Sequence, residues 1–284
     1  MRICRFNDNR LGVVMDDGIH DVSAVLASIP AATYPFPKHD ALIANLATLR
    51  PLMEAAVKGA PAINPDSVEL LSPVANPGKI IAAPVNYKKH LEEALADKGI
   101  HHGKLVDEIH RAGLFLKATS SVVGAGAGVD LVHTDRRNDH EVELAVVIGK
   151  TAKNTKLADA LSHVAGYCIG LDITIRGPED RSFRKSPDSY CVLGPWLVTA
   201  DELPDPSHLD LSIKVNDQVR QQSNTSDLIL NVQQLIVWAS SFYTLHPGDV
   251  IITGTPQGVG PIKAGDVMDA QIQRIGAMRV AVRG

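Results

Sequence analysis

The apolar residues of this chain recur mainly in short runs separated by turn residues, which is the pattern of a strand-rich protein. Near the start, the apolar runs RICRF and LGVVM are separated by Asn and Asp residues at 7–9, and LGVVM is followed by Asp16, Asp17 and Gly18. Both connections consist of residue types that favour turns. Residues 144–148 and 164–171 are apolar at nearly every position. These two runs predict strands that are covered on both faces.

Helical spacing of apolar residues is confined to a few segments. It predicts helices over about residues 40–60, after residue 87, and within 223–245, where capping residues precede a long amphipathic run. The strands do not alternate with helices as they do in a doubly wound sheet. The predicted fold class is therefore α+β, with a mixed β-sheet forming a roll or barrel-like catalytic domain.

Proline-rich breaks at residues 30–37, 61–65 and 72–77 interrupt the pattern. We place a domain boundary at the last of them. The prediction is a small N-terminal α/β domain over residues 1–74 and a catalytic domain over residues 75–284.

Composition narrows the class of protein. With 284 residues and 45% hydrophobic content, the chain is able to bury a sizeable core. A net charge of −4 without a basic run argues against nucleic-acid binding. No run of about 18 apolar residues and no hydrophobic signal region are present, so we expect neither membrane insertion nor export but a cytoplasmic protein. The three cysteines lie far apart in apolar contexts, which predicts buried reduced thiols.

The strongest candidate chemistry lies in an alternating acidic stretch. Asp139, Glu141 and Glu143 fall on one face of an extended strand, because side chains repeat every second residue. Asp172 ends the second apolar run and offers a further oxygen ligand. Crowded carboxylates at the edge of a core need a compensating cation, and a divalent metal is suitable. The alternative is a solvated strand edge without an ion, and spacing alone does not decide between them.

Two other positions carry open alternatives. His90 and Glu93 are three residues apart, so they are adjacent on one helical face, either as a general base with its orienting carboxylate or as an exposed pair in a charged helix. Lys117 emerges from an apolar run, and it either reaches the surface or points into a polar pocket.

Two irregular segments are rich in charge. Residues 101–111 carry three histidines and predict a mobile, solvated lid or loop. Residues 173–196 combine prolines with the cations Arg176, Arg181, Arg184 and Lys185. Cationic irregular chain between two strands often handles substrate anions, and the alternative is a plain surface loop.

Taken together, these pieces resemble the fumarylacetoacetate hydrolase superfamily in its form with a short N-terminal domain. The resemblance runs from about residue 78 to the end, with weaker support in the first 25 residues. The matching motifs are Asn86-Tyr87 with His90 and Glu93, FLK at 115–117, HEVELAVVIGK at 140–150, AGYCIGLD at 165–172, LGPW at 193–196, QSNTSDLI at 222–229, PGDVIITGTPQGVG at 247–260 and AGD at 264–266.

The resemblance implies a divalent metal, Mg²⁺ or Mn²⁺ with Ca²⁺ as a further option, held by Glu141, Glu143 and Asp172. Hard oxygen ligands without Cys or His agree with that choice. It implies further that His90 deprotonates a water molecule and that Glu93 orients it.

The remaining roles also follow from the resemblance. Lys185 would stabilise developing oxyanion charge or manage a proton, while Arg176 and Thr255 would contact the substrate. We assign Lys117 and Glu179 to substrate binding as well. Two departures are visible: Glu179 stands where relatives have a glutamine, and Pro187 stands where the family often has an aromatic residue. Glu179 therefore leaves the substrate's identity open.

The implied function is metal-dependent hydrolysis of a carbon–carbon bond in a 1,3-diketo acid, such as an acylpyruvate or fumarylacetoacetate, in the catabolism of aromatic compounds. Within the same fold, the alternative is a decarboxylase, isomerase or hydratase of an unsaturated 2-oxo diacid, or an oxaloacetate decarboxylase. A protein of another class, a binding or scaffold protein that kept the fold and lost the chemistry, is disfavoured by the intact candidate residues. A homodimer is expected from the family, and the apolar segments SSFYTL and GPWLV belong either to its interface or to the core.

Overall fold

The computed structural model describes residues 1–101 and 108–284. Part of the expected lid over residues 101–111 lies outside the described residues. The short helices α4 (Lys98–His101) and α5 (Ile109–Ala112) flank that part of the chain.

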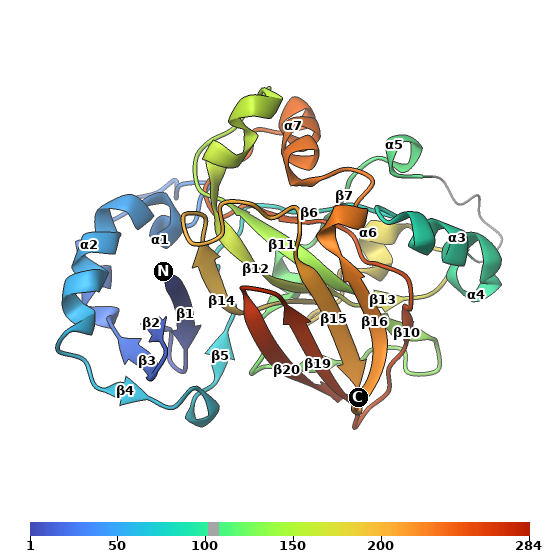
Figure 1. The fold of residues 1–284 in the computed structure, drawn as a ribbon, viewed down its shortest axis with the longest axis horizontal. Coiled ribbons are helices and arrows are strands. Elements are labelled where there is room, and N and C mark those ends of the chain that lie inside the picture. Colours follow the sequence, from blue (N-terminus) through green and yellow to red (C-terminus); the bar gives the residue numbers. More distant parts are fainter. Residues whose placement is uncertain (102–107) are drawn as a thin grey trace.

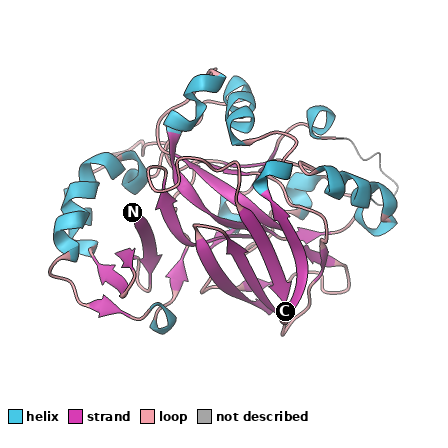
Figure 2. Ribbon diagram, in the orientation of Figure 1, coloured by secondary structure: helices cyan, strands magenta, loops and turns pink. Residues whose placement is uncertain are grey.

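Strands form the centre of the molecule, and most helices lie at its periphery (Figure 2). The strands of the largest described sheet are β1 (Arg2–Phe6), β2 (Arg10–Met15), β3 (Gly18–Asp21), β4 (Ala62–Ile63), β5 (Leu70–Leu71), β6 (Ile80–Ala82), β7 (Phe115–Lys117), β8 (Val122–Val123), β11 (Val142–Ile148), β12 (Val164–Asp172), β14 (Cys191–Thr199) and β17 (Val250–Ile252). Their order is β4-β3-β2-β1-β14-β12-β11-β17-β6-β7, with β5 paired to β1 and β8 to β14.

The central strands β11 and β12 are antiparallel neighbours, buried along nearly their whole length. Alternate residues of β11 enter two different cores: Leu144 and Val146 pack in one, while Ala145 and Val147 pack in the other. This explains the unbroken apolar run, since each face of the strand meets its own layer of side chains. The prediction of a strand covered on both faces is therefore correct.

Two smaller sheets complete the described strands. One contains β10 (Asn138–His140), β13 (Thr174–Ile175) and β18 (Gly260–Pro261); the other contains β9 (Val129–Asp130), β15 (Asp210–Val215), β16 (Gln218–Asn224), β19 (Val267–Ile272) and β20 (Gly276–Arg283). Asn216 and Asp217 have φ of 50° and 66° in the turn between β15 and β16, as expected of a tight hairpin. The α+β class is confirmed, and the mixed sheets are open rather than closed into a barrel.

The first part of the chain forms a lobe at one end of the large sheet, at the left in Figure 1. Its helices α1 (Ala41–Ala44) and α2 (Leu46–Val57) lie in the segment predicted as one helix over residues 40–60. Leu49 and Met53 of α2 pack with Ile3 and Val13 in a separate core. Strand β1 pairs antiparallel with β14, so the N-terminal strands extend the sheet of the remaining chain. The division at residue 74 stays a prediction.

Helix α7 (Val232–Phe242) begins later than the capping residues of 223–227 indicate. Residues 225–227 form a 3-10 turn, and the helix does not begin at once because the side-chain amide of Asn86 bonds to both backbone groups of Leu230. Nδ2 of Asn86 donates to the Leu230 carbonyl at 2.9 Å, and its Oδ1 accepts from the Leu230 amide at 2.8 Å. The effective cap is Asn231, which forms a capping box with Gln234.

The other helices are α3 (Lys88–Ala96) and α6 (Arg181–Arg184). Within the described residues, no helix has both the length and the apolar character needed to cross a bilayer. Cys4, Cys168 and Cys191 are all buried free thiols, as predicted.

Candidate active site

Three carboxylates converge at the junction of two sheets. Glu141 lies between β10 and β11, Glu143 follows on β11, and Asp172 ends the neighbouring strand β12. The register pairs Val142 with Leu171, which brings the carboxylates together across the ladder. One oxygen of each carboxylate lies within 4.8 Å of the others, and all three side chains are buried. The alternative of a solvated strand edge therefore does not hold for Glu141 and Glu143.

Two lysines compensate this buried negative charge. Nζ of Lys185 donates to Glu141 Oε2 and Asp172 Oδ2, both at 2.7 Å, and to Thr174 Oγ1 at 2.6 Å. Nζ of Lys117 donates to Asp172 Oδ1 at 2.5 Å and to the carbonyls of Tyr190 and Lys185. All three protons of each ammonium group are thus engaged.

The carboxylates nevertheless differ in their protonation. Burial opposes ionisation of Glu141, but Lys185 and Arg176 outweigh it and lower its pKa to about 2. Burial, reinforced by Asp172 and Glu141, raises the pKa of Glu143 well above its ordinary value. Within the described residues, Glu143 has one hydrogen bond, in which its Oε2 accepts from the Gly254 amide at 2.6 Å. The strand thus presents one ionised carboxylate beside one that resists ionisation.

This donor set fits a hard divalent cation. It consists of carboxylate oxygens from Glu141 just before β11, Glu143 on β11 and Asp172 at the end of β12, with no sulfur ligand. Glu143 forms no ion pair within the described residues, so no cation directly compensates its burial and its two carboxylate neighbours, and its pKa is high for that reason. A divalent ion would provide the missing positive charge.

Arg176 fixes the acidic stretch from its other side. Its Nε donates to Asp139 Oδ2 at 2.7 Å and its Nη2 to Glu141 Oε1 at 2.9 Å. One guanidinium spans both carboxylates because they are two residues apart on extended chain, as the alternation predicted. Asp139 also accepts from Arg137, so it belongs to an arginine cluster rather than to the carboxylate triad.

His90 and Glu93 form a hydrogen-bonded pair on α3. Nδ1 of His90 lies 2.8 Å from Glu93 Oε2, and the backbone N–H of Gly258 donates to Glu93 Oε1 at 2.9 Å. The imidazole is only 5% exposed, which excludes the alternative of an exposed surface pair. A carboxylate at Nδ1 favours the tautomer with the proton there, so Nε2 carries the lone pair.

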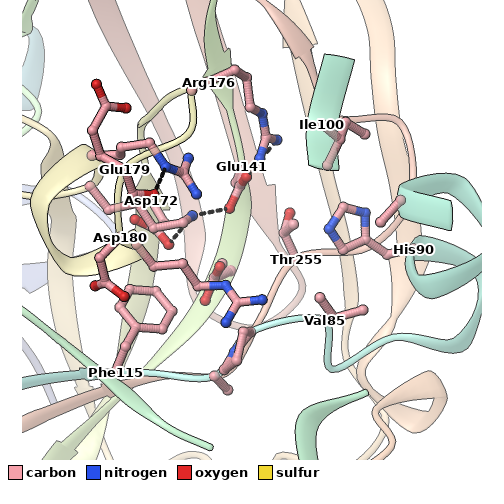
Figure 3. Close-up of a pocket in the computed structure, with 18 residues that line it drawn as sticks. Val85, His90, Ile100, Phe115, Glu141, Asp172, Arg176, Glu179, Asp180 and Thr255 are labelled. Carbon is pink, nitrogen blue, oxygen red and sulfur yellow. Dashed lines mark hydrogen bonds and ion pairs between the residues drawn. The ribbon is translucent and has the colours of Figure 1, made fainter. Parts of the chain in front are cut away.

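These groups share one cavity of about 260 Å³. Figure 3 shows His90 on one side of it and Glu141 and Asp172 on the other, with Thr255 between them. The predicted site residues that line the cavity are His90, Glu141, Glu143, Asp172, Arg176, Glu179, Lys185 and Thr255.

Two predicted residues are placed differently. The structure does not bring Lys117 to the cavity wall, because its buried ammonium lies behind Asp172 and holds two carbonyls. Glu179 reaches the wall, but its carboxylate accepts from both terminal nitrogens of Arg136, at 3.1 and 2.8 Å. That ion pair lowers the pKa of Glu179. Substrate contact for these two residues stays a prediction.

Sequence reasoning missed Gln221, a buried amide on β16. Its Nε2 donates to Thr255 Oγ1 at 2.8 Å, while its Oε1 accepts from the Val142 amide at 3.0 Å. His140 Nδ1 lies 3.2 Å from the same oxygen. Gln221 therefore connects the acidic strand to Thr255. Nothing in a polar strand such as QVRQQSN distinguishes this residue in advance.

The chain was compared with known proteins. The family model described as fumarylacetoacetate (FAA) hydrolase, C-terminal, matches residues 79–283. Maleylpyruvate hydrolase of Aquipseudomonas alcaligenes is 61% identical over 285 residues, which cover 100% of this chain and 99% of that protein. A mitochondrial oxaloacetate tautomerase of Xenopus laevis is 34% identical to this chain. The match covers 98% of this chain and 89% of the tautomerase.

A solved structure is also similar along the whole chain. Maleylpyruvate hydrolase from Sphingobium sp. SYK-6, in complex with manganese(II) and pyruvate, is 41% identical with a TM-score of 0.84. The match covers 100% of this chain and 99% of that one. The enzymatic character expected from the sequence is thereby confirmed. The chain belongs to the fumarylacetoacetate hydrolase family.

Proposed function

We propose that this protein is a metal-dependent hydrolase that cleaves a carbon–carbon bond in a 1,3-diketo acid, with maleylpyruvate as the first substrate to test. The observation that carries the proposal is a His90–Glu93 pair facing the carboxylate triad across one cavity. The relatives named maleylpyruvate hydrolase support the choice of substrate, and one of them holds pyruvate with manganese. Such an activity belongs to the breakdown of aromatic compounds.

Glu141, Glu143 and Asp172 would hold the metal, which we propose to be Mg²⁺ or Mn²⁺ because all the donors are hard oxygens. When bound, such an ion supplies a Lewis acid for the adjacent oxygens of a 2-oxo acid. The buried setting strengthens this effect, since a low dielectric strengthens interactions between charges.

His90 is the general base in this proposal. Its Nε2 lone pair takes a proton from water, and the oxygen of that water forms a bond to the carbonyl carbon remote from the carboxylate of the pyruvate unit. Glu93 at Nδ1 stabilises the imidazolium that results. The carbon–carbon bond then breaks, and its electron pair moves to the pyruvate unit. The proton on His90 then passes to the carbon of the pyruvate unit that lost its bond, giving pyruvate and a second acid.

The other residues hold and orient the substrate. Arg176 and Thr255 line the cavity on either side of Glu141 and provide polar contacts for the 2-oxo acid end. Thr255 Oγ1 already accepts from Gln221 and donates to the Val142 carbonyl at 3.0 Å, so a hydrogen bond from Thr255 to the substrate requires its proton to turn away from that carbonyl. A direct bond from Lys185 to the substrate requires that one of its three present bonds be exchanged.

The experiment is a turnover assay with maleylpyruvate, monitored by the loss of substrate absorbance and by pyruvate release, in Mn²⁺ or Mg²⁺ and after EDTA treatment. We expect metal-dependent hydrolysis, and we expect His90→Ala to lower kcat by about 100- to 10,000-fold. Full hydrolysis by His90→Ala would refute the assigned base. Absence of hydrolysis by the wild-type enzyme across a panel of acylpyruvates would refute the function.

Oxaloacetate chemistry is the second candidate, because tautomerases of oxaloacetate are 34% identical to the chain. Tautomerisation moves a proton and breaks no carbon–carbon bond, so it releases no pyruvate from oxaloacetate, whereas hydrolysis releases pyruvate from an acylpyruvate. Assaying the wild type for both reactions separates the two candidates.

We also propose a cytoplasmic homodimer. Phe242 in the segment SSFYTL is 71% exposed, which supports this segment as part of an interface. Trp196 of GPWLV instead donates to the Ile275 carbonyl within the same chain, at 2.7 Å. Light scattering after size-exclusion chromatography of the wild type and Phe242→Ser tests the assembly.

A further inference from the structure

Two arginines that the proposed mechanism does not use line the same cavity. Arg181 and Arg184 are three residues apart on α6, so they lie on one face of this short helix. Arg184 immediately precedes Lys185, whose ammonium group contacts the carboxylate triad. The two guanidinium groups are therefore attached to the segment that closes the cavity next to the proposed metal site.

Arg184 is buried, yet its hydrogen bonds go only to uncharged groups. Its Nε donates to the Glu179 carbonyl at 3.0 Å and its Nη1 to the Ile175 carbonyl at 2.8 Å. Within the described residues no carboxylate forms an ion pair with it. Burial, and the neighbouring Arg176 and Arg181, lower the pKa of Arg184. A buried cation without a carboxylate is costly, and an anionic ligand would compensate it.

Arg181 is partly buried, and neither a hydrogen bond nor an ion pair of its side chain is found within residues 1–101 and 108–284. The acids nearest in sequence are engaged elsewhere. Glu179 accepts twice from Arg136, and Asp180 caps α6 by accepting from the Ser182 amide at 2.8 Å. Arg176 differs from both arginines, because two carboxylates neutralise it. Among the described residues, Arg181 and Arg184 are thus the arginines of the cavity wall without an ion-paired carboxylate.

We infer that Arg181 and Arg184 bind a second carboxylate of the substrate, so that the enzyme selects 2-oxo acids with an acidic group at both ends. This inference rests on the proposed function, in which the carboxylate triad and Arg176 take the 2-oxo acid end. A guanidinium recognises a carboxylate through paired, charge-assisted hydrogen bonds, so two neighbouring guanidiniums favour a dianionic substrate over a monoanionic one of equal length. The small cavity favours a short ligand.

The test compares 2-oxoadipate with 2-oxohexanoate, which have six carbons each and differ in the distal carboxylate. Binding of each to the Mn²⁺-loaded enzyme is measured by calorimetry for the wild type, Arg181→Gln and Arg184→Lys. Arg279→Gln is the control, because Arg279 is an exposed arginine of β20 outside the cavity.

We expect the wild type to prefer 2-oxoadipate by at least about tenfold. Arg181→Gln should weaken 2-oxoadipate binding by about 10- to 100-fold, the range for hydrogen bonds to charged groups, and change 2-oxohexanoate binding by less than about twofold. Arg184→Lys keeps the charge but loses the planar, two-pronged guanidinium. It should therefore also reduce the preference for 2-oxoadipate over 2-oxohexanoate, but by a smaller factor. Arg279→Gln should match the wild type.

Equal affinity of the wild type for the two acids would overturn the inference. So would an equal loss for both acids in Arg181→Gln, since that would indicate a structural role. Circular dichroism of each variant establishes that it is folded. Because the readout is binding, it is independent of turnover: discrimination without hydrolysis of any acylpyruvate would refute the proposed function and leave the diacid site standing.

Discussion

The side chain of Glu93 is held by the backbone of Gly258, whose N–H donates to Oε1 at 2.9 Å while Oε2 faces His90. This bond joins helix α3 to the loop after β17, which also carries Thr255. The proposed base and a substrate-contacting residue are therefore aligned by the same loop. Because orientation of the base depends on a distant loop, changes at Gly258 should affect catalysis.

Replacement of Glu93 by Gln should lower kcat by about tenfold or more and change KM less, because the single amide oxygen can accept from only one of His90 and Gly258 and does not stabilise the protonated imidazole. Steady-state kinetics with a hydrolysed acylpyruvate measure both constants. The matched control is Glu92→Gln, since Glu92 is an exposed neighbour on the same helix. Equal kinetics of the two variants would show that Glu93 does not support the base.

Gly258→Ala should reduce both stability and kcat. Gly258 has φ of +93°, and an added Cβ would lie 2.1 Å from the Arg220 carbonyl, so the loop must shift and withdraw its N–H from Glu93. We expect a loss of about 1–3 kcal/mol in unfolding free energy, measured by urea denaturation. Gly265→Ala is the control, because Gly265 has φ of +91° but nothing within 4 Å of the added Cβ. If Gly265→Ala loses as much activity, backbone strain alone explains the effect.

Lys117→Met should destabilise the fold by about 3–5 kcal/mol, because it leaves a buried Asp172 oxygen without its cation. The carbonyls of Tyr190 and Lys185 lose a donor at the same time. Thermal and urea unfolding measure the change. Lys150→Met provides the comparison at an exposed lysine, where we expect a change within about 0.5 kcal/mol. Wild-type stability of Lys117→Met would contradict this structural role.

Removal of metal by EDTA should abolish hydrolysis, and Mn²⁺ or Mg²⁺ should restore it. A metal that binds only the folded state stabilises it by about 2.7 kcal/mol at a hundred times its dissociation constant, so the melting temperature should rise with added metal. Glu143→Gln should lose most of that rise, because it removes one of the three converging carboxylates. An unchanged metal-dependent rise in this variant would exclude Glu143 as a ligand.

The three thiols should not react with Ellman's reagent at pH 8 in the folded protein. Burial raises the pKa of Cys4 and Cys191 from the ordinary 9.0 to about 12, so neither forms a thiolate at pH 8. Because the pKa of these thiols is higher in the folded than in the unfolded state, they contribute stability below pH 9 that is lost as the pH rises toward 12. Titration should find all three thiols only after denaturation. Rapid reaction of a folded-state thiol would contradict their burial.

Much of the local structure followed from the sequence, because it depends on neighbours along the chain. The apolar runs ending at Ile148 and Asp172 correctly predicted the central strands, and Asn216-Asp217 correctly predicted a turn. The start of α7 was predicted too early, because the side-chain amide of Asn86 binds the backbone of Leu230 and holds this residue outside the helix. Such a contact leaves no periodic signal.

For the site, the sequence determined that Glu141 and Glu143 share a strand face, since alternation is a property of extended chain itself. Only the tertiary structure decided that Asp172 joins them, through the register of β11 and β12, and that Lys117 turns inward behind that carboxylate. It also assigned Asp139 to the arginines and linked Glu93 to Gly258. These choices depend on which distant groups meet in the fold, because burial makes an unpaired charge costly.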